Sequence, residues 1–401
     1  MGQVQVNGEN LSLDHFICCR SNFCVDKNRL FNSLSRRKKY GWWIVNIFRK
    51  DLDNKPEIRV AVPVKKYMMS LNESSLNPIE ALSSKLAETF SNVQLNRYVS
   101  SVTPDLKRSL AEYVGHGINE SQILFGNGVD DMLYFIFTAV RNYNSSYALS
   151  LAPSYFDYKT YSGSIGLDME FLDFNQDFNF SVDDYLEKLN YPGCELGIIC
   201  NPNNPTGHLI PDKKIVHILK NTMKPILIDE TYFEFSGKTF VDMVKEFPNI
   251  IITRSFSKSF SAAGLRFGYI ISSEENIKFL NKVIPVFNCS ILTQALALTI
   301  LENREVFVDN NKKIIASKEE MFNTMKEYKE MTIYPSHTNF LTFSLGENSE
   351  EFNQFLLERD ISVRPVGAHA LLANHLRVTV ADEESNQAFL DALSTYLKGK
   401  H

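Results

Sequence analysis

The sequence predicts an α/β protein, in which a mostly parallel sheet is covered by helices and a smaller α+β domain follows. From about residue 120, short apolar runs recur, and each is followed by a loop rich in Gly, Pro, Asn or Ser and then by a helical pattern. The runs are QILF, YALSLA, LGIIC, PILI, NIIIT and FGYII. Runs that are apolar on both faces and separated by helix-length segments are typical of parallel strands. With 401 residues, 44% of them hydrophobic, the chain is large enough for two domains.

Domain boundaries are expected where this pattern changes. Residues 1–66 form an extension that carries the basic run RRKK at 36–39 and the aromatic pair at 42–43. Residues 67–97 are expected to form an arm that joins the smaller domain, and residues 98–283 form the large domain with the apolar runs. Residues 284–401 contain a long helical stretch, the short strands NFLTFSL and LRVTV, and a terminal helix, which together predict an α+β domain.

The extension has two interpretations. We expect a solvated, partly helical segment that packs on the main body, and a separate binding module is the alternative. The formal net charge of -5 gives no reason to expect nucleic acid or an anionic membrane as a partner. The longest apolar runs, such as PILI and WWIV, are too short to cross a bilayer.

The cysteines and the N-terminal residues predict a cytoplasmic protein. The six cysteines do not form a paired framework, and the first residues lack the apolar core of a secretory signal. Cys18, Cys19 and Cys24 have no second cysteine or histidine pair at zinc spacing, so no metal site is expected.

Candidate functional residues lie in the loops that follow the apolar runs, because ligands of open parallel sheets bind beyond the carboxyl ends of the strands. The first loop, GNGVDDML, places Gly128 before a helix that begins near Val129. The free amides of such a helix suit a phosphate, although a glycine turn before a helix is also common without any ligand. The second loop, APSYFDY, places Tyr155 beyond its strand, where an aromatic ring stacks on a planar ligand or belongs to the core.

Three further loops carry polar chemistry. The segment NPNNPTG, residues 201–207, fixes a tight path and presents side-chain amides. Asp229 ends the run PILI, and a buried carboxylate requires a cationic partner, either a ligand or a neighbouring arginine. The stretch RSFSKSFSAAGLRFGY surrounds Lys258 with serines and places Arg266 nearby, which suggests a bound anion beside a nucleophilic amine.

One ligand, pyridoxal 5'-phosphate, matches the chemistry of all five loops. It has a planar ring, a phosphate, a ring nitrogen that becomes cationic, a phenolate oxygen and an aldehyde. Lys258 would form the imine with the aldehyde, Asp229 would keep the ring nitrogen protonated, and Tyr155 would stack on the ring.

The motifs GNGVDD, PSYFDY, NPNNPTG, DETYFEF, SFSKSFSAAGLRFGY and LRVTV, in this order, resemble the fold-type I pyridoxal-phosphate aminotransferases of class I/II, in their histidinol-phosphate aminotransferase branch. The resemblance covers about residues 67–398 and implies a seven-stranded, mostly parallel sheet. It implies that Asn204 and Tyr232 donate to the phenolate oxygen. It also implies that the phosphate is held by the backbone amides of Val129 and Asp130 and by Ser255, Ser257 and Arg266, with Gly128 as a further cofactor-binding residue.

The resemblance also implies a homodimer and a substrate site. Tyr98, in LNRYVSS, matches the tyrosine that such enzymes lend to the phosphate site of the neighbouring subunit. Arg377 matches the arginine that binds the substrate α-carboxylate. Arg364 matches a residue that contacts a distal phosphate, and a surface salt bridge is its alternative role. Asn72 lies in LNESSLNP, where the family usually has NENPYG, and is a candidate substrate residue.

Two smaller departures from the family pattern occur near the cofactor motifs. Thr231 replaces the usual alanine of DEAY, and Asp131 replaces a glutamate. Because the cofactor motifs are kept while the segment at 71–78 differs, the identity of the substrate is the least determined feature.

The predicted function is transfer of an amino group between an amino acid or amino alcohol phosphate and a 2-oxo acid. In this reaction Lys258 moves a proton at the substrate α-carbon. The alternatives on the same scaffold are a decarboxylase of a phosphorylated amino acid and a cyclase or eliminase. A more remote alternative is a cofactor-sensing regulator that binds DNA through residues 1–66. We also expect Trp42 and Trp43 to pack across the dimer or over the active-site mouth.

Overall fold

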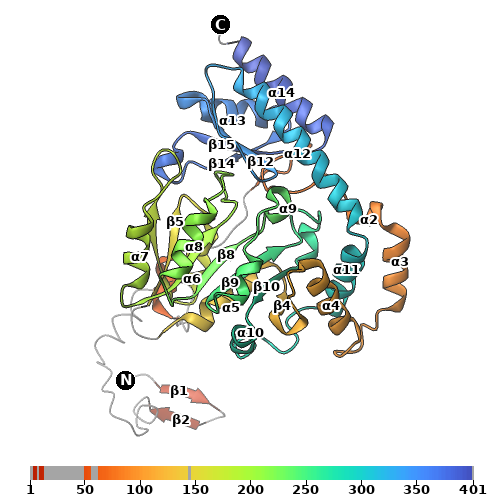
Figure 1. Cartoon of the computed structure of the whole chain (residues 1–401), viewed down its shortest axis with the longest axis vertical. Helices are drawn as coiled ribbons and strands as arrows, with labels where there is room; N and C mark the ends of the chain where they lie inside the picture. Colours follow the sequence, from red (N-terminus) through yellow and green to blue (C-terminus); the bar gives the residue numbers. More distant parts are fainter. Residues whose placement is uncertain (1–2, 7–8, 13–48, 56–61, 143–145, 400–401) are drawn as a thin grey trace. The chain divides into compact units, whose positions relative to one another are not determined.

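The computed structural model describes residues 3–6, 9–12, 49–55, 62–142 and 146–399 (Figure 1). The chain divides into two units, Met1–Arg59 and Val60–His401. In the first unit, strand β1 (Gln3–Val6) pairs antiparallel with β2 (Glu9–Ser12), and a 3-10 helix, η2, spans Lys50–Asn54. The basic run at 36–39, the tryptophans at 42–43 and the cysteines at 18, 19 and 24 lie outside the described residues.

The second unit contains a seven-stranded sheet. Strand β10 runs antiparallel to both of its neighbours, β4 and β9, and all the other pairs are parallel. The prediction of a mostly parallel sheet is therefore confirmed. The order across the sheet is β4 (Ile123–Gly126), β10 (Gly268–Ser272), β9 (Ile250–Ser255), β8 (Ile226–Asp229), β7 (Cys194–Cys200), β5 (Tyr147–Ala152) and β6 (Asp168–Asp173).

The continuous apolar runs are explained by burial on both faces of this sheet. Along β9, Ile250 and Ile252 belong to one hydrophobic cluster and Ile251 to another. Successive side chains of a strand point to opposite faces, so both faces need apolar residues. The first cluster includes side chains of α4 (Val102–Val114), α7 (Val182–Asn190), α8 (Asp212–Lys220) and α11 (Ile291–Glu302), and the second includes side chains of α5 (Val129–Val140), α6 (Asp157–Ser164) and α10 (Glu274–Leu280).

A four-stranded sheet carries a third hydrophobic cluster. Its order is β11 (Thr332–Ile333), β12 (Phe340–Ser344), β15 (His375–Thr379) and β14 (Arg364–Pro365). Its helices are α12 (Glu305–Lys326), α13 (Ser349–Leu357) and α14 (Glu383–Lys398), which Figure 1 shows beside this sheet. Strand β3 (Tyr67–Met68) pairs with β13 (Ile361–Ser362). The expected smaller α+β domain, built from the N-terminal arm and the C-terminal part, is confirmed.

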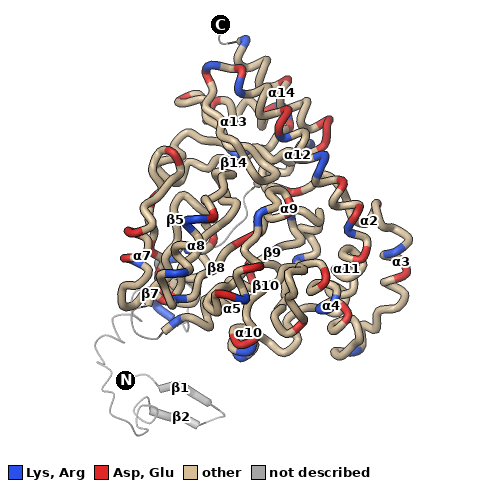
Figure 2. Tube along the Cα trace, viewed as in Figure 1, with Lys and Arg blue, Asp and Glu red and all other residues tan. Residues whose placement is uncertain are grey.

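Short helices complete the second unit. They are α2 (Pro78–Ala81), α3 (Ser83–Asn92), α9 (Phe233–Ser236) and the 3-10 helices η3 (Glu120–Gln122), η4 (Val241–Lys245), η5 (Ala263–Leu265), η6 (Gly346–Asn348) and η7 (Ala370–Leu372). Within the described part of the chain, none of the helices has the length and apolar character needed to span a bilayer. Acidic and basic residues are interspersed along α12 and α14 (Figure 2), as is typical of solvated helix faces.

Candidate active site

The strand register brings the predicted loops to one edge of the seven-stranded sheet. Ser255, the last residue of β9, lies opposite Gly268, which in turn lies opposite Gly126 at the end of β4. Asp229 ends β8 and lies opposite Thr253 of β9. Since β4, β5, β7, β8 and β9 share one direction, the loops that follow them meet at this edge.

Asp229 is a buried carboxylate surrounded by neutral donors. It is 4% exposed, and it accepts hydrogen bonds from the hydroxyl of Tyr158 (2.6 Å) and from the hydroxyl of Thr231 (2.7 Å). Burial raises the pKa of its carboxyl, and these hydrogen bonds oppose the rise. Among the described residues, no ion pair includes Asp229. The site therefore suits a cation supplied by a ligand.

Arg254, which follows the residue opposite Asp229, is a candidate structural partner, but it pairs with another carboxylate. Its Nε and Nη2 donate to Oε2 of Glu230 at 3.0 and 2.9 Å, and both side chains are buried. Thr253 and Asp229 lie opposite each other in the β8–β9 pair. Arg254 follows Thr253 and Glu230 follows Asp229, so both side chains point to the opposite face of the sheet from Asp229. Arg254 therefore pairs with Glu230 and does not neutralise Asp229.

Lys258 lies in the loop that follows β9, and its amine contacts the N-terminal arm. Its Nζ donates to the carbonyl oxygen of Leu71 at 2.8 Å. Burial, and then the positive charge of Arg377, lower the pKa of the amine from 10.5 to about 8. At this pKa about a tenth of the amine is neutral at pH 7, and the neutral form is the one that a nucleophile or a general base requires.

The residues predicted to hold a phosphate gather around the first turn of α5. Gly128 has φ 89° and no side chain with which to cap the helix. Gly268 allows a close approach, because a Cβ added there would lie 2.7 Å from the backbone nitrogen of Val129. Nη2 of Arg266 donates to Oδ2 of Asp130 at 2.7 Å. A helix N-terminus beside an arginine is an arrangement that suits an anion.

Ser255, Ser257 and Tyr155 complete this part of the site. Both serines are buried, and the Ser255 hydroxyl accepts from the backbone nitrogen of Ser257 at 3.1 Å. Tyr155 is half-buried, and its hydroxyl donates to Asp130 at 3.3 Å. Its ring packs edge-on against Tyr158, with 5.3 Å between the ring centroids.

Arg377 is a buried guanidinium whose hydrogen bonds are all to neutral acceptors. Nη1 donates to Oδ1 of Asn204 at 2.6 Å, and Nη2 donates to the carbonyl oxygen of Ser70 at 2.8 Å. Its buried Nε has no hydrogen-bond partner among the described residues. Burial lowers the pKa of this group to about 10. A carboxylate is the ligand that satisfies such a group best. Arg364 lies opposite Arg377 in the β14–β15 pair and is exposed.

Asn72 and Tyr232 are joined directly. Asn72 has φ 55° and is buried, and its Nδ2 donates to the Tyr232 hydroxyl at 2.7 Å. Its backbone nitrogen donates to Oγ1 of Thr379 at 2.9 Å. Both ends of the Asn72 side chain contact protein, since its Oδ1 also accepts from Thr379. Asn72 is therefore placed to hold the Tyr232 ring.

Sequence reasoning did not identify the contacts that Tyr158, Thr231 and Leu71 make with the predicted residues. A signal for Tyr158 exists, because it follows Tyr155 by three residues, close to one helical turn. Thr231 was noted only as a departure from the family pattern. The Leu71 carbonyl is a backbone group, and its contact with Lys258 spans 187 positions.

Tyr98 lies on an exposed apolar surface. It is 78% exposed, and its ring stacks on Phe287 with 4.5 Å between centroids. Val99 and Val286, adjacent to these two in sequence, are also exposed, as is Leu95. Exposed apolar side chains of this size are typical of a protein–protein contact where they gather on one surface.

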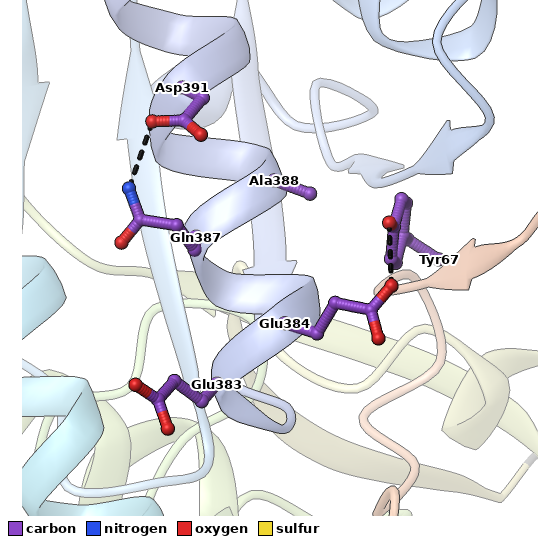
Figure 3. A pocket seen from close by; sticks show the side chains of 6 residues that line it. All are labelled: Tyr67, Glu383, Glu384, Gln387, Ala388 and Asp391. Carbon is purple, nitrogen blue, oxygen red and sulfur yellow. Dashed lines mark hydrogen bonds between the residues drawn. The ribbon is translucent and has the colours of Figure 1, made fainter.

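A separate hollow lies on the surface of α14 (Figure 3). The hydroxyl of Tyr67 donates to Glu384 there, and Lys66 donates to the same carboxylate. The residues that line it are Tyr67, Glu383, Glu384, Gln387, Ala388 and Asp391. None of the predicted site residues lines this hollow, so we do not assign it to the site.

A family model described as aminotransferase class I and II matches residues 64–393. The chain belongs to this family. It is a pyridoxal-phosphate-dependent aminotransferase of fold type I, so the predicted enzyme class and cofactor are confirmed.

Relatives and a solved structure of this family cover most of the chain. A histidinol-phosphate aminotransferase of Caldanaerobacter subterraneus is 30% identical over 354 residues, which are 88% of this chain and 99% of the relative. One of Ruminiclostridium cellulolyticum is 32% identical over 348 residues, 84% of this chain and 96% of the relative. The structure of a histidinol-phosphate aminotransferase from Sinorhizobium meliloti in complex with pyridoxal-5'-phosphate aligns with a TM-score of 0.79. It is 20% identical and covers 89% of this chain and 99% of that chain.

Proposed function

We propose that this aminotransferase acts on an amino acid or an amino alcohol phosphate, such as histidinol phosphate, with a 2-oxo acid as the amino acceptor. The observation that carries the proposal is Arg377, a buried guanidinium with one unpaired N–H group and no carboxylate partner among the described residues. The 30% identity to histidinol-phosphate aminotransferases over nearly their whole length supports the choice of substrate class.

The residues present fit pyridoxal phosphate. Asp229 would hold the ring nitrogen, since it is buried among neutral donors and lacks a cation among the described residues. Asn204 and Tyr232 would donate to the phenolate oxygen, and Tyr155 would stack on the ring. When bound, the cofactor supplies a protonated ring that accepts electrons from the substrate α-carbon. The phosphate would be held by the group around α5, namely Gly128, Val129, Asp130, Ser255, Ser257 and Arg266.

Lys258 would move the proton at the substrate α-carbon. Its lowered pKa allows the amine both to take up and to release a proton near neutral pH. The Leu71 carbonyl, which accepts from Nζ, holds the amine beside the N-terminal arm. Asn72 acts through Tyr232, because its side-chain amide occupies an acceptor position of that hydroxyl and leaves the Tyr232 proton available for donation.

Two arginines would bind the substrate. Arg377 would pair with the α-carboxylate in a bidentate manner. For an amino alcohol phosphate, which lacks this carboxylate, the phosphate would occupy the distal position. Arg364 is exposed on the neighbouring strand and would meet that distal anionic group. Substrates with an anionic tail would therefore be preferred over those with a neutral tail.

The active unit would be a homodimer in which Tyr98 of each protomer completes the phosphate site of its partner. The exposed apolar surface around Tyr98 and Phe287 supports this assembly. Within each protomer, we propose an arm at 67–97, a large domain at 98–283 and a smaller domain at 284–401. The separate hydrophobic clusters of the two sheets support this division.

A panel of amino donors tests the function. The purified protein is loaded with pyridoxal phosphate and mixed with amino acids and phosphorylated amines in turn. A substrate changes the visible absorbance of the cofactor and yields a keto product, and a 2-oxo acid restores the original spectrum. Lys258→Ala is the control that should yield no keto product. Release of carbon dioxide without any need for a keto acceptor would reject transamination in favour of decarboxylation.

A further inference from the structure

The hydrogen bonds that reach Asp229 fall unevenly on its two oxygens. Oδ1 accepts from the backbone nitrogen of Thr231 at 3.1 Å, from the hydroxyl of Thr231 at 2.7 Å and from the hydroxyl of Thr253 at 3.3 Å. Oδ2 accepts from the Tyr158 hydroxyl at 2.6 Å. A carboxylate oxygen has about two lone-pair sites, so Oδ1 is filled while Oδ2 has room for one further donor.

Thr231 supplies two of the three donors on Oδ1. Its hydroxyl makes the shorter of its two hydrogen bonds, and both come from one residue fixed in the turn after β8. Two donors at a fixed separation restrict rotation of the carboxylate about its Cβ–Cγ bond. A hydrogen bond from a hydroxyl also stabilises the ionised form of a carboxylate and lowers its basicity.

We infer that Thr231 is a positioning residue for Asp229. Its hydroxyl holds Oδ1, so that Oδ2 is left to accept from the protonated ring nitrogen of pyridoxal phosphate, and it keeps the carboxylate a weaker base than that nitrogen. This inference rests on the proposed role of Asp229. Without the hydroxyl, the carboxylate gains basicity and rotational freedom, and the shared proton moves toward Asp229.

Three variants test the role of the hydroxyl. Thr231→Val keeps the shape and removes the hydroxyl, Thr231→Ser restores a hydroxyl, and Thr231→Ala guards against misfolding of the valine variant. Thr253→Val removes the longer hydrogen bond on the same oxygen, and Thr89→Val is a remote control on α3. Each protein is loaded with pyridoxal phosphate that is ¹⁵N-labelled at the ring nitrogen. The nitrogen chemical shift, the pH titration of the visible absorbance and the kcat and KM values are then measured.

The valine and alanine variants should move the nitrogen shift toward that of an unprotonated pyridine and lower kcat about tenfold, with KM little changed, since a hydrogen bond to a charged group contributes this much. Thr231→Ser should restore both readouts, Thr253→Val should show a smaller change and Thr89→Val none. An unchanged nitrogen shift in Thr231→Val and Thr231→Ala overturns the inference while leaving the function intact. Failure of the wild-type protein to take up the cofactor overturns both.

Discussion

The side-chain amide of Asn72 donates a 2.7 Å hydrogen bond to the hydroxyl of Tyr232, although 160 positions separate the two residues. This contact joins the N-terminal arm to the loop after β8 and buries both side chains.

Two substitutions of Asn72 separate the contribution of this hydrogen bond to stability from the contribution of the backbone conformation at residue 72. Both Asn72→Gly and Asn72→Ala remove the donor, and each should lower the free energy of unfolding by about 1–3 kcal/mol, because buried groups lose their partners. Asn72→Ala should lower the free energy of unfolding by about 1 kcal/mol more than Asn72→Gly, since residue 72 has φ 55°, a backbone conformation that favours glycine. Denaturant unfolding measures both values. Equal stability of the two variants would contradict a strained backbone at this position.

The pKa of Lys258 predicts a pH dependence of stability in the cofactor-free protein. The folded amine has a pKa of about 8 and the unfolded amine one of 10.5. Between these values the unfolded chain binds the proton that the folded chain has released, so the free energy of unfolding rises with pH. Relative to Lys258→Met, the wild-type protein should gain up to about 3 kcal/mol across this window. Parallel stability curves for the two proteins would argue against the lowered pKa.

Arg377→Lys should raise KM for amino-acid substrates about a hundredfold, while the affinity for pyridoxal phosphate changes less than about twofold. Lysine keeps the charge but loses the planar pair of donors that a carboxylate requires. Steady-state kinetics and cofactor titration measure the two effects. Arg364→Gln serves as the comparison, and it should weaken only substrates with an anionic group at the distal position. Parallel losses of substrate and cofactor binding in Arg377→Lys would refute its role.

Gly268→Ala should weaken cofactor binding. The added Cβ would lie 2.7 Å from the backbone nitrogen of Val129 and 2.8 Å from the carbonyl carbon of Gly128, so the first turn of α5 must shift. We expect about a tenfold or larger increase in the dissociation constant of pyridoxal phosphate, because the helix amides lose their alignment. Gly264→Ala is the matched control, since nothing lies within 4 Å of the Cβ built there. Similar cofactor affinity in both variants would contradict the prediction.

A mixing experiment tests the proposed sharing of Tyr98 between two protomers. Tyr98→Ala and Lys258→Ala should each have little activity alone, and subunit exchange should restore it. If the subunits pair at random, about half of the dimers are heterodimers. Each heterodimer has one intact site, so about a quarter of all sites become active. The activity of the mixture after exchange, compared with that of the unmixed variants, measures this. No recovery, with exchange verified by a tagged subunit, would exclude sharing of Tyr98.

Much of the site could be predicted because it lies at strand ends. Asp229 and Lys258 each follow an apolar run, and parallel strands bring such positions to one edge. The sequence alone could not show whether a ligand or an arginine is the cationic partner of Asp229, because this depends on the register of β8 and β9. Arg254 is one residue beyond Thr253 and so faces Glu230 on the other side of the sheet.

Contacts across long sequence separations could not be predicted. The Leu71 carbonyl carries no side-chain signal, and its approach to Lys258 depends on how the arm crosses the sheet edge. Thr231 was visible as an unusual residue, but its hydrogen bond depends on the side-chain torsion in the turn after β8. The spacing of apolar residues predicts which side chains are buried, but it does not predict which polar atoms form hydrogen bonds.

The arm contacts the end of the chain, through Asn72 with Thr379 and through Ser70 with Arg377, and 307 positions separate the members of each pair. A ribosome makes the arm 307 positions before these partners, at roughly 5–20 residues per second. The side of the pocket that contains Arg377 therefore remains incomplete until β15 has been made. A nascent chain that stops short of β15 has the residues proposed to hold the cofactor but lacks Arg377, the arginine proposed to bind the substrate.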